Sequence, residues 1–345
     1  MAAGAGLAAH AVGSGAAAKA PAGQAPSPRG YARWAHGLVH YYDTGSGTPL
    51  LLLHQAPMSA RQFEAVLTPL AARGIRAIAV DLPGFGCSDP TPFVPAVGDW
   101  VPAIVAVMDH LGLKRSHVLG HHTGALVATE VAVQAPARVS RLILNGAFPI
   151  TAEERAAGLE GVRKREIEFE YRDDGQHMQD SFLSHQRAYG PGSDARLITR
   201  YVVEKFQGFG PFWYGHHAAY QYDHAASLPR ITQPTLLLSN TGDRIHPQAL
   251  RARALRPDFA YAELSGGTGA IIDQQPEAWA DAVADFLGTR RVAVGANTNT
   301  GEARSCSVVC SSSRWLRVEW SRVAVSVRPS CGLEIATCVS VRSGI

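Results

Sequence analysis

The stretch HVLGHHTG, residues 117–124, decides the fold and raises the first question about chemistry. A buried strand that runs into Gly-x-residue-x-Gly and continues as a helix is the nucleophile elbow, in which a Ser normally occupies the point of the turn. Here Gly120 and Gly124 frame the turn, and the imidazole of His122 stands at its point. The stretch therefore predicts either a turn of another kind or an elbow with altered chemistry.

From about residue 31 to residue 288, short apolar runs alternate with helical periods. Apolar runs bounded by turn signals predict buried strands, and apolar residues spaced three and four apart predict helices. Strands are expected at 38–42, 49–54, 75–80, 117–119, 141–145, 235–239 and 260–264, and helices at 59–73, 99–111, 125–134 and 276–287. This alternation indicates an α/β fold, with a mostly parallel central sheet and helices on both of its faces.

Residues 151–226 interrupt the alternation, because they are rich in charged and aromatic residues and show no strand pattern. They predict a helical cap, inserted between the two parts of the sheet domain at 31–150 and 227–288. Its aromatic residues are expected in the core of the cap and in its contacts with the sheet domain. Some of them, such as Trp213, are also candidates for the wall of an apolar pocket.

The two ends of the chain differ from the rest in composition. Residues 1–30, rich in Ala, Gly and Pro, predict a flexible leader that lacks the basic start and apolar stretch of a secretory signal. Residues 289–345 carry eight Arg, three Glu and four of the five Cys, without a sustained helical or strand period. Their Cys spacing fits no usual zinc site, and a disulfide module would need export. We expect a low-order tail, and we hypothesise that it is read out of frame from a GC-rich gene.

The overall composition excludes several classes of protein. Hydrophobic residues make up 46% of the 345, enough for a large core, which excludes a wholly disordered chain. The net charge of +3 gives no indication of nucleic-acid binding, and no apolar run reaches the roughly 18 residues of a membrane span. We expect a cytoplasmic protein whose partner is a small-molecule substrate, with no nucleic acid and no membrane. The oligomeric state stays open.

Five segments, in this order, resemble the α/β-hydrolase fold family across about 250 residues. They are LLLLHQAP (50–57), DLPGFGCSDP (81–90), VLGHHTG (118–124), PTLLLSNTGD (234–243) and ELSGGTGAIIDQQPEAWADAVADFL (263–287). The resemblance implies a nucleophile, an acid and a His in that order along the chain. Asp243 stands at the position of the acid, whereas His122 replaces the nucleophile and Gly269 replaces the triad His.

The two departures from the pattern are expected to be linked. We hypothesise that the ring of His122 fills the volume left free at Gly269 and hydrogen-bonds Asp243. The carboxylate would then fix the tautomer of the ring and raise its basicity. Such a pair could act as a general base or as a nucleophile. In the alternative interpretation, His122 only fills space in a site that has lost catalysis.

The resemblance also implies an oxyanion hole at the elbow. Its expected donors are the backbone N–H of Thr123 and an N–H of the 54–56 loop, for which Gln55 is the first candidate. Four further pocket candidates are His54, His121, Asn145 and His246. We expect His54 to brace the loop, His121 to be structural or to face solvent, and Asn145 to hydrogen-bond in the pocket. His246 is expected at the surface. It is also the nearest candidate in the sequence for a base that could replace the triad His.

Together these features predict an enzyme that acts on a small, largely apolar carbonyl compound, by hydrolysis of an ester or lactone. No metal and no organic cofactor are expected. The alternatives are a cofactor-free lyase in the same pocket and a non-catalytic ligand-binding protein, because function belongs to the site and not to the fold. The retained Asp243 and the reactive imidazole of His122 favour the enzyme.

Overall fold

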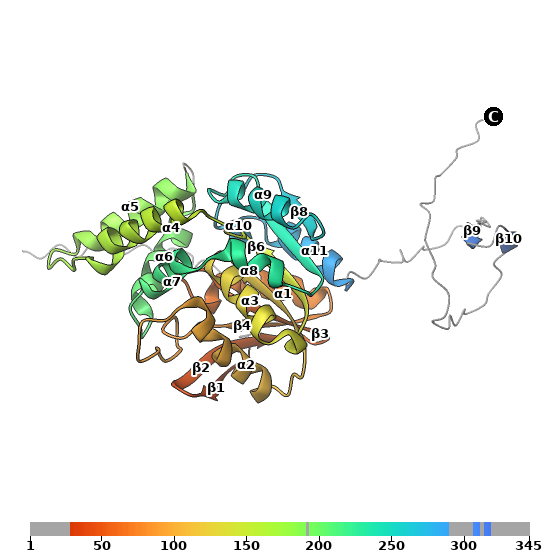
Figure 1. Cartoon of the computed structure of the whole chain (residues 1–345), viewed down its shortest axis with the longest axis horizontal. Helices are drawn as coiled ribbons and strands as arrows, with labels where there is room; N and C mark the ends of the chain where they lie inside the picture. The colour runs from red at the N-terminus through yellow and green to blue at the C-terminus, as the bar shows by residue number, and fades with distance from the viewer. Residues whose placement is uncertain (1–27, 191–192, 290–305, 311–313, 319–345) are drawn as a thin grey trace, which may run out of the picture. The chain divides into compact units, whose positions relative to one another are not determined.

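Short runs of Leu, Ile, Val and Ala form the buried strands of a central sheet in this computed structural model, which describes residues 28–190, 193–289, 306–310 and 314–318 (Figure 1). The strands of the sheet are β1 (Arg29–Trp34), β2 (Gly37–Thr44), β3 (Thr48–Leu53), β4 (Ile75–Val80), β5 (Ser116–His121), β6 (Val139–Asn145), β7 (Thr235–Asn240) and β8 (Ala260–Leu264). Their order is β1-β2-β4-β3-β5-β6-β7-β8. Neighbours from β4 to β8 are parallel, whereas β2 pairs antiparallel with β1 and β4. The predicted mostly parallel sheet is confirmed.

The edge strand β1 was not expected, and it begins inside the predicted leader. Only Ala32 and Trp34 of its six residues are buried, so its apolar pattern is too short to stand out. Pairing with β2 fixes it at the edge of the sheet. Residues 29 and 30, which were assigned to the leader from the sequence, therefore belong to the sheet, and residues 1–27 lie outside the described part of the chain.

Helices cover both faces of the sheet, as predicted (Figure 1). Side chains of α2 (Val101–His110), α3 (Thr123–Gln134) and α9 (His246–Leu255) belong to the core on one face. Those of α1 (Glu64–Ala72), α10 (Ile271–Gln274) and α11 (Pro276–Leu287) belong to the core on the other. The central strand β3 contributes side chains to both cores. Leu51 and Leu53 pack in the core with α2, α3 and α9, and Leu50 and Leu52 pack in the core with α1, α10 and α11. No helix in the described ranges is long and apolar enough to cross a membrane.

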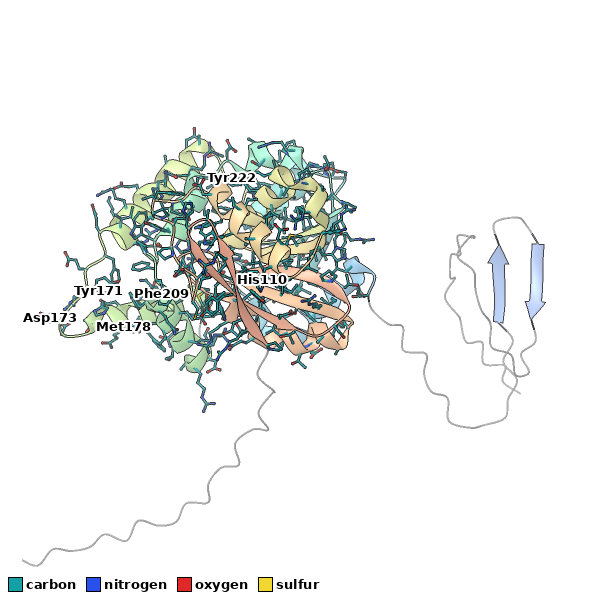
Figure 2. The ribbon with its side chains drawn as sticks, turned by 90° about the horizontal axis from the view of Figure 1, so that it is seen from below. His110, Tyr171, Asp173, Met178, Phe209 and Tyr222 are labelled. Carbon is teal, nitrogen blue, oxygen red and sulfur yellow. The ribbon has the colours of Figure 1, made fainter. Side chains whose placement is uncertain are left out.

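A helical insertion, residues 151–226, leads from β6 towards β7. Thr151 caps its first helix by accepting a hydrogen bond from the N–H of Glu154. Its helices are α4 (Ala152–Val162), α5 (Gln176–Tyr189), α6 (Ala195–Gln207), α7 (Tyr214–Gln221) and α8 (His224–Ser227, which ends just beyond it). The described residues of the insertion form no strand. Exposed side chains on it include Tyr171, Met178 and Phe209 (Figure 2).

Polar contacts fasten α6 to the sheet domain. Arg200 and the hydroxyl of Tyr201 both donate to one oxygen of Asp273, at 2.7 and 2.6 Å. One turn further along α6, Glu204 accepts hydrogen bonds from the N–H and the hydroxyl of Ser59, at 3.0 and 2.8 Å. These contacts hold α6 against the loop before α1 and against α10.

Residues 292–345 form a second unit, described here by itself. It contains two short antiparallel strands, β9 (Cys306–Cys310) and β10 (Arg314–Val318). Both strands lie within residues 289–345, where no sustained period was seen in the sequence. Val308, Val309 and Trp315 favour extended backbone, and five-residue strands are too short to show a sustained period. The remaining residues of that unit lie outside the described part.

Candidate active site

The stretch 117–124 forms a sharp turn from β5 into α3 with His122 at its point. The backbone of His122 has φ 48° and ψ −112°, and it is the one non-glycine residue with positive φ in the described ranges. Both glycines are required by close backbone approaches. A Cβ at Gly120 would lie 2.0 Å from the carbonyl oxygen of Gly124, and a Cβ at Gly124 would lie 2.0 Å from that of Leu53. The turn is therefore an elbow that presents an imidazole.

The side chain of His122 meets Asp243, which follows β7. Nε2 of His122 lies 2.6 Å from Oδ2 of Asp243, so the contact predicted from the sequence is present. The other carboxylate oxygen of Asp243 accepts a hydrogen bond from the N–H of Ile245 at 3.1 Å. The carboxylate is almost completely buried, whereas 21% of the His122 side chain remains exposed.

Two glycines make room for the His122 ring. A Cβ at Gly269 would lie 3.3 Å from Cε1 of His122, and a Cβ at Gly146 would lie 2.6 Å from Cδ2. A side chain at position 269, such as the His that the family pattern places there, would therefore crowd the imidazole and require it to shift. The ring occupies part of the volume that the change to Gly269 leaves free.

The charge at this site is set by Asp243 and its neighbours. Burial alone would raise the pKa of Asp243, but the adjacent His122, its hydrogen bond and the Ile245 N–H outweigh burial and hold the pKa well below the ordinary value. In the neutral form of the ring, the ionised carboxylate accepts the proton of Nε2 of His122, and Nδ1 then carries a lone pair. Within 28–190 and 193–289, Nδ1 of His122 has no hydrogen-bond partner.

A second imidazole, His121, lies beside the first. The ring centroids of His121 and His122 are 4.3 Å apart. Successive residues of an extended strand point to opposite faces, so the unusual backbone at His122 brings these rings together. His121 is completely buried, so it is structural and does not face solvent. Burial, and then the neighbouring His122, lower its pKa well below the ordinary value.

The side chain of Gln62 fixes the tautomer of His121. The N–H of Gln55 donates to Oε1 of Gln62 at 2.9 Å, and this contact identifies which end of the amide is the oxygen. Nε2 of Gln62 must then donate to Nδ1 of His121, at 2.8 Å. The neutral His121 ring therefore carries its proton on Nε2, an atom that is buried and has no partner among the described residues.

The cluster of His121, His122 and Asp243 is also the place where a metal ion would be considered. One nitrogen or oxygen of each residue lies within 4.8 Å of the others, and two imidazoles with one carboxylate are ligands that several divalent metals accept. However, the tautomer set by Gln62 presents a proton, not a lone pair, on the free nitrogen of His121. A metal ion at this cluster would require Gln62 to move.

The candidate donors of an oxyanion hole differ in part from those expected from the sequence. The N–H of Thr123, first residue of α3, has no acceptor in the described part of the chain and is free to receive an oxyanion. The N–H of Gln55 is not free, because it donates to Gln62. Ala56 lines the cavity, and its N–H forms no hydrogen bond with a described residue. Ala56 therefore replaces Gln55 as the second candidate donor.

The buried candidates His54 and Asn145 support the site from behind and do not line the cavity. Nε2 of His54 accepts a hydrogen bond from the N–H of Leu82 at 2.9 Å, which braces the loop as expected. Asn145 accepts a hydrogen bond from the indole of Trp279 at 2.8 Å and donates to the carbonyl of Leu238 at 3.2 Å. Their assignment to the pocket was wrong, because both side chains bond to groups inside the sheet domain. His121 is excluded from the cavity for the same reason.

Trp213 and His246 also lie away from the cavity lining. The ring of Trp213 packs edge-on against Tyr214, with centroids 4.7 Å apart. His246 pairs with Glu263 at 2.7 Å, at the start of α9. His246 is held by its own carboxylate, so it is not placed to replace His122 as a base at the elbow.

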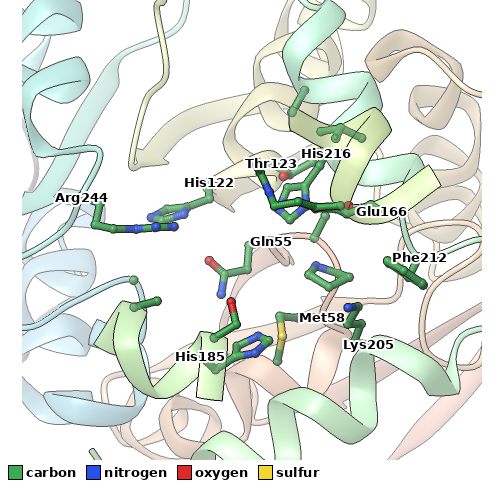
Figure 3. Close-up of a pocket in the computed structure, with 18 of the residues that line it drawn as sticks. Gln55, Met58, His122, Thr123, Glu166, His185, Lys205, Phe212, His216 and Arg244 are labelled. Atoms are coloured by element: carbon green, nitrogen blue, oxygen red, sulfur yellow. The ribbon is translucent and has the colours of Figure 1, made fainter. Parts of the chain in front are cut away.

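A cavity of about 830 Å³ connects the elbow with the helical insertion (Figure 3). Core residues in its wall are Gln55, Ala56, Pro57, Met58, His122, Thr123, Leu126, Phe148, Asp243, Arg244, Ile245 and Gly269. Residues of the insertion in its wall are Val162, Arg165, Glu166, Phe169, Asp180, Ser181, Ser184, His185, Arg187, Ala188, Tyr189, Lys205, Phe212, His216, Ala219 and Tyr220. The expected apolar side chains are present in this wall, but they share it with many charged groups.

Several residues of the insertion and of the segment before α1 that contact or line the site were not among the candidates from the sequence. Glu166 and His216 form a second imidazole–carboxylate pair in the cavity wall, with Nδ1 of His216 2.7 Å from Oε1 of Glu166. Glu166 and His216 lie 50 positions apart, and Gln62 lies 59 positions from His121, so no local spacing signals either contact. Arg244 follows Asp243 directly in the sequence, so its position near the site could have been predicted.

Residues 48–260 match the family model described as alpha/beta hydrolase fold. The chain belongs to this family. It is 30% identical over 224 residues to a non-heme haloperoxidase of Rhodococcus erythropolis, covering 61% of this chain and 80% of that protein. It is 34% identical over 124 residues to a haloalkane dehalogenase of Mycolicibacterium paratuberculosis, covering 34% of this chain and only 40% of the relative.

A solved structure agrees with the fold assignment. The enol-lactonase from Burkholderia xenovorans LB400 superimposes with a TM-score of 0.61 at 17% identity, over 75% of this chain and all of that one. At this identity the likeness shows the α/β-hydrolase fold alone.

Proposed function

We propose that this protein hydrolyses a small acyl compound, an ester or a lactone, with His122 as a general base held by Asp243. The observation that carries the proposal is the position of the His122 ring, at the elbow point and 2.6 Å from a buried carboxylate. The lone pair on Nδ1 and the free N–H of Thr123 provide a base and an oxyanion donor in one cavity. Membership of a family with hydrolases among its members supports the same reaction class.

In the proposed reaction, Nδ1 of His122 takes a proton from a water molecule as the water oxygen attacks the acyl carbon. Asp243 stabilises the imidazolium that forms. The N–H groups of Thr123 and Ala56 receive the oxyanion of the tetrahedral intermediate. When the intermediate collapses, the bond to the leaving oxygen breaks and the imidazolium returns its proton to that oxygen. The products are a carboxylic acid and an alcohol, or a hydroxy acid from a lactone.

General-base catalysis is favoured over attack by the imidazole itself. The nitrogen bound to Asp243 is Nε2, so the free nitrogen is Nδ1, next to the ring carbon that carries the side chain. A covalent acyl group on Nδ1 would be crowded by the backbone of the elbow, whereas a small water molecule fits more easily. A burst of product equal to the enzyme concentration would instead indicate an acyl-imidazole.

The test compares the full chain with His122→Ala and His246→Ala on a panel of small esters and lactones. His246 is the matched control, because it also pairs with a carboxylate and its side chain is 20% exposed, against 21% for His122. We expect hydrolysis to fall about 10²–10⁴-fold in His122→Ala and to stay unchanged in His246→Ala. Undiminished turnover in a folded His122→Ala variant, or no turnover of any ester or lactone by the native chain, would reject the proposal.

A further inference from the structure

The cavity contains positive charges that the protein itself does not neutralise. Arg165, Arg187, Lys205 and Arg244 line it, and none of the four forms an ion pair with a described residue. Two of the cavity carboxylates, by contrast, are paired with imidazoles: Asp243 with His122 and Glu166 with His216. The third, Asp180, is exposed and accepts a hydrogen bond from Gln176.

Lys205 is the half-buried cation of this group, while the three arginines are exposed. Its ammonium lies over the faces of Phe169, Phe206 and Phe212, with Nζ 4.3, 4.8 and 4.5 Å from the ring centroids. Among the described residues, its hydrogen-bond acceptor is Oγ of Ser181, at 3.4 Å. Aromatic faces attract an ammonium but cannot cancel its charge. Lys205 is thus held in place and keeps its donors available to the cavity.

The arrangement gives the cavity two chemically different parts (Figure 3). The elbow part contains His122 and Thr123, and Lys205 and Phe212 lie on the side of the insertion. Burial lowers the pKa of Lys205, while the charge of Glu166 acts in the opposite direction and favours the ammonium. Oε1 of Glu166 is hydrogen-bonded to His216, its Oε2 has no hydrogen-bond partner among the described residues, and Glu166 forms no ion pair with Lys205.

We propose that the substrate carries a carboxylate that binds to Lys205 while its ester or lactone carbonyl lies at His122. This inference rests on the proposed function and names the substrate class. A carboxylate would give the ammonium the charge-assisted hydrogen bonds that it lacks within the protein. The exposed Arg165, Arg187 and Arg244 raise the concentration of anions near the cavity.

A substrate without a carboxylate, such as a neutral and largely apolar ester, fits this cavity less well. Its binding would remove water from Lys205 without supplying an acceptor, and an unpaired buried charge is costly. A cavity of about 830 Å³ has room for a small acyl compound with both groups.

The experiment measures binding separately from turnover. Monomethyl glutarate, which has one carboxylate and one ester, is titrated by calorimetry into the full-length His122→Ala protein. Dimethyl glutarate is the neutral probe of similar size. We expect the monoanion to bind at least about tenfold more tightly than the diester, and this preference to disappear when Lys205→Met is added. Lys205→Arg should keep the preference.

The matched control is Lys164→Met, which removes an exposed lysine of the insertion that does not line the cavity. It should leave the preference for the monoanion unchanged. Circular dichroism and melting temperature report whether each variant is folded, and Lys205→Arg supplies the test if Lys205→Met is not. Equal affinity for the two probes, or an unchanged preference in a folded Lys205→Met variant, would overturn the carboxylate site. Neither result depends on catalysis, so the hydrolase proposal is judged separately by turnover.

Discussion

The imidazole of His122 lies against position 269, where a Cβ would be 3.3 Å from Cε1 of His122, a tight contact that the ring could relieve only by shifting. The ring also fits against Gly146, where a Cβ would lie 2.6 Å from Cδ2. The two departures from the family pattern, His122 at the elbow and Gly269 at the ordinary His position, are therefore in direct contact in the structure. A His at the elbow point is therefore accommodated best when the ordinary His position carries no side chain.

The first prediction concerns reversal of this arrangement. We expect Gly269→His to collide with His122 and to destabilise the fold by about 1–3 kcal/mol, the usual cost of overpacking. The double variant His122→Ser, Gly269→His should be more stable than Gly269→His alone, because the Ser frees the volume. Urea unfolding of the two single variants and the double variant measures the coupling. Additive free energies of unfolding would contradict the shared volume.

The second prediction concerns pH. The native pKa of Asp243 is held below its ordinary value of about 3.9, mainly by His122 acting against burial. The carboxylate therefore contributes stability that is fully present above the unfolded pKa and is lost as the pH falls below about 4 towards the native pKa. Asp243→Asn should lower the free energy of unfolding at pH 7 and flatten its acid dependence. Urea unfolding from pH 7 to pH 3 should show the two proteins converging, and parallel curves would contradict the assignment.

The third prediction concerns Gln62. Gln62→Leu leaves the N–H of Gln55 and Nδ1 of His121 buried without partners, so we expect a loss of about 1–3 kcal/mol in the free energy of unfolding. Gln62→Glu should move the proton of His121 from Nε2 to Nδ1, because a carboxylate accepts where the amide donates. Nitrogen-15 spectra of the imidazoles report this change of tautomer. An unchanged His121 signal in Gln62→Glu would contradict the hydrogen-bond chain.

The fourth prediction concerns the attachment of α6. Asp273→Asn removes the charged acceptor shared by Arg200 and Tyr201, and we expect a loss of about 2 kcal/mol. The control is Asp281→Asn in α11. Its partner Arg73 also pairs with Glu277, so we expect a smaller loss from this substitution. Thermal unfolding compares them, and equal melting temperatures for the two variants would contradict a special role of Asp273.

Local sequence patterns were sufficient to predict the elbow and most strands of the central sheet. The elbow followed from Gly120 and Gly124, and the contact of His122 with Asp243 followed from the missing side chain at Gly269. Apolar runs located seven of the eight strands of the central sheet, whereas β1 has too few buried positions to be found.

Contacts between distant side chains were not predictable in this way. Gln62 reaches across 59 positions to His121, and Lys205 is enclosed by rings from separate parts of the insertion. Such contacts depend on how the helices are placed in space. The periodicity of apolar residues along the sequence indicates local secondary structure only and does not report these contacts. The polar character of the cavity was misjudged for the same reason, since aromatic residues were visible but their charged neighbours in space were not.

The attachment of α6 has a consequence for how the protein unfolds. Ser59 and Glu204 are 145 positions apart in the chain, and Tyr201 and Asp273 are 72 apart, so these bonds connect segments on both sides of the insertion. If the insertion opened alone, Glu204 and Asp273 would lose these partners, an added cost to local opening. The helical insertion and the sheet domain are therefore expected to melt in a single cooperative transition, and amide hydrogens in α6 should exchange as slowly as those in the central strands.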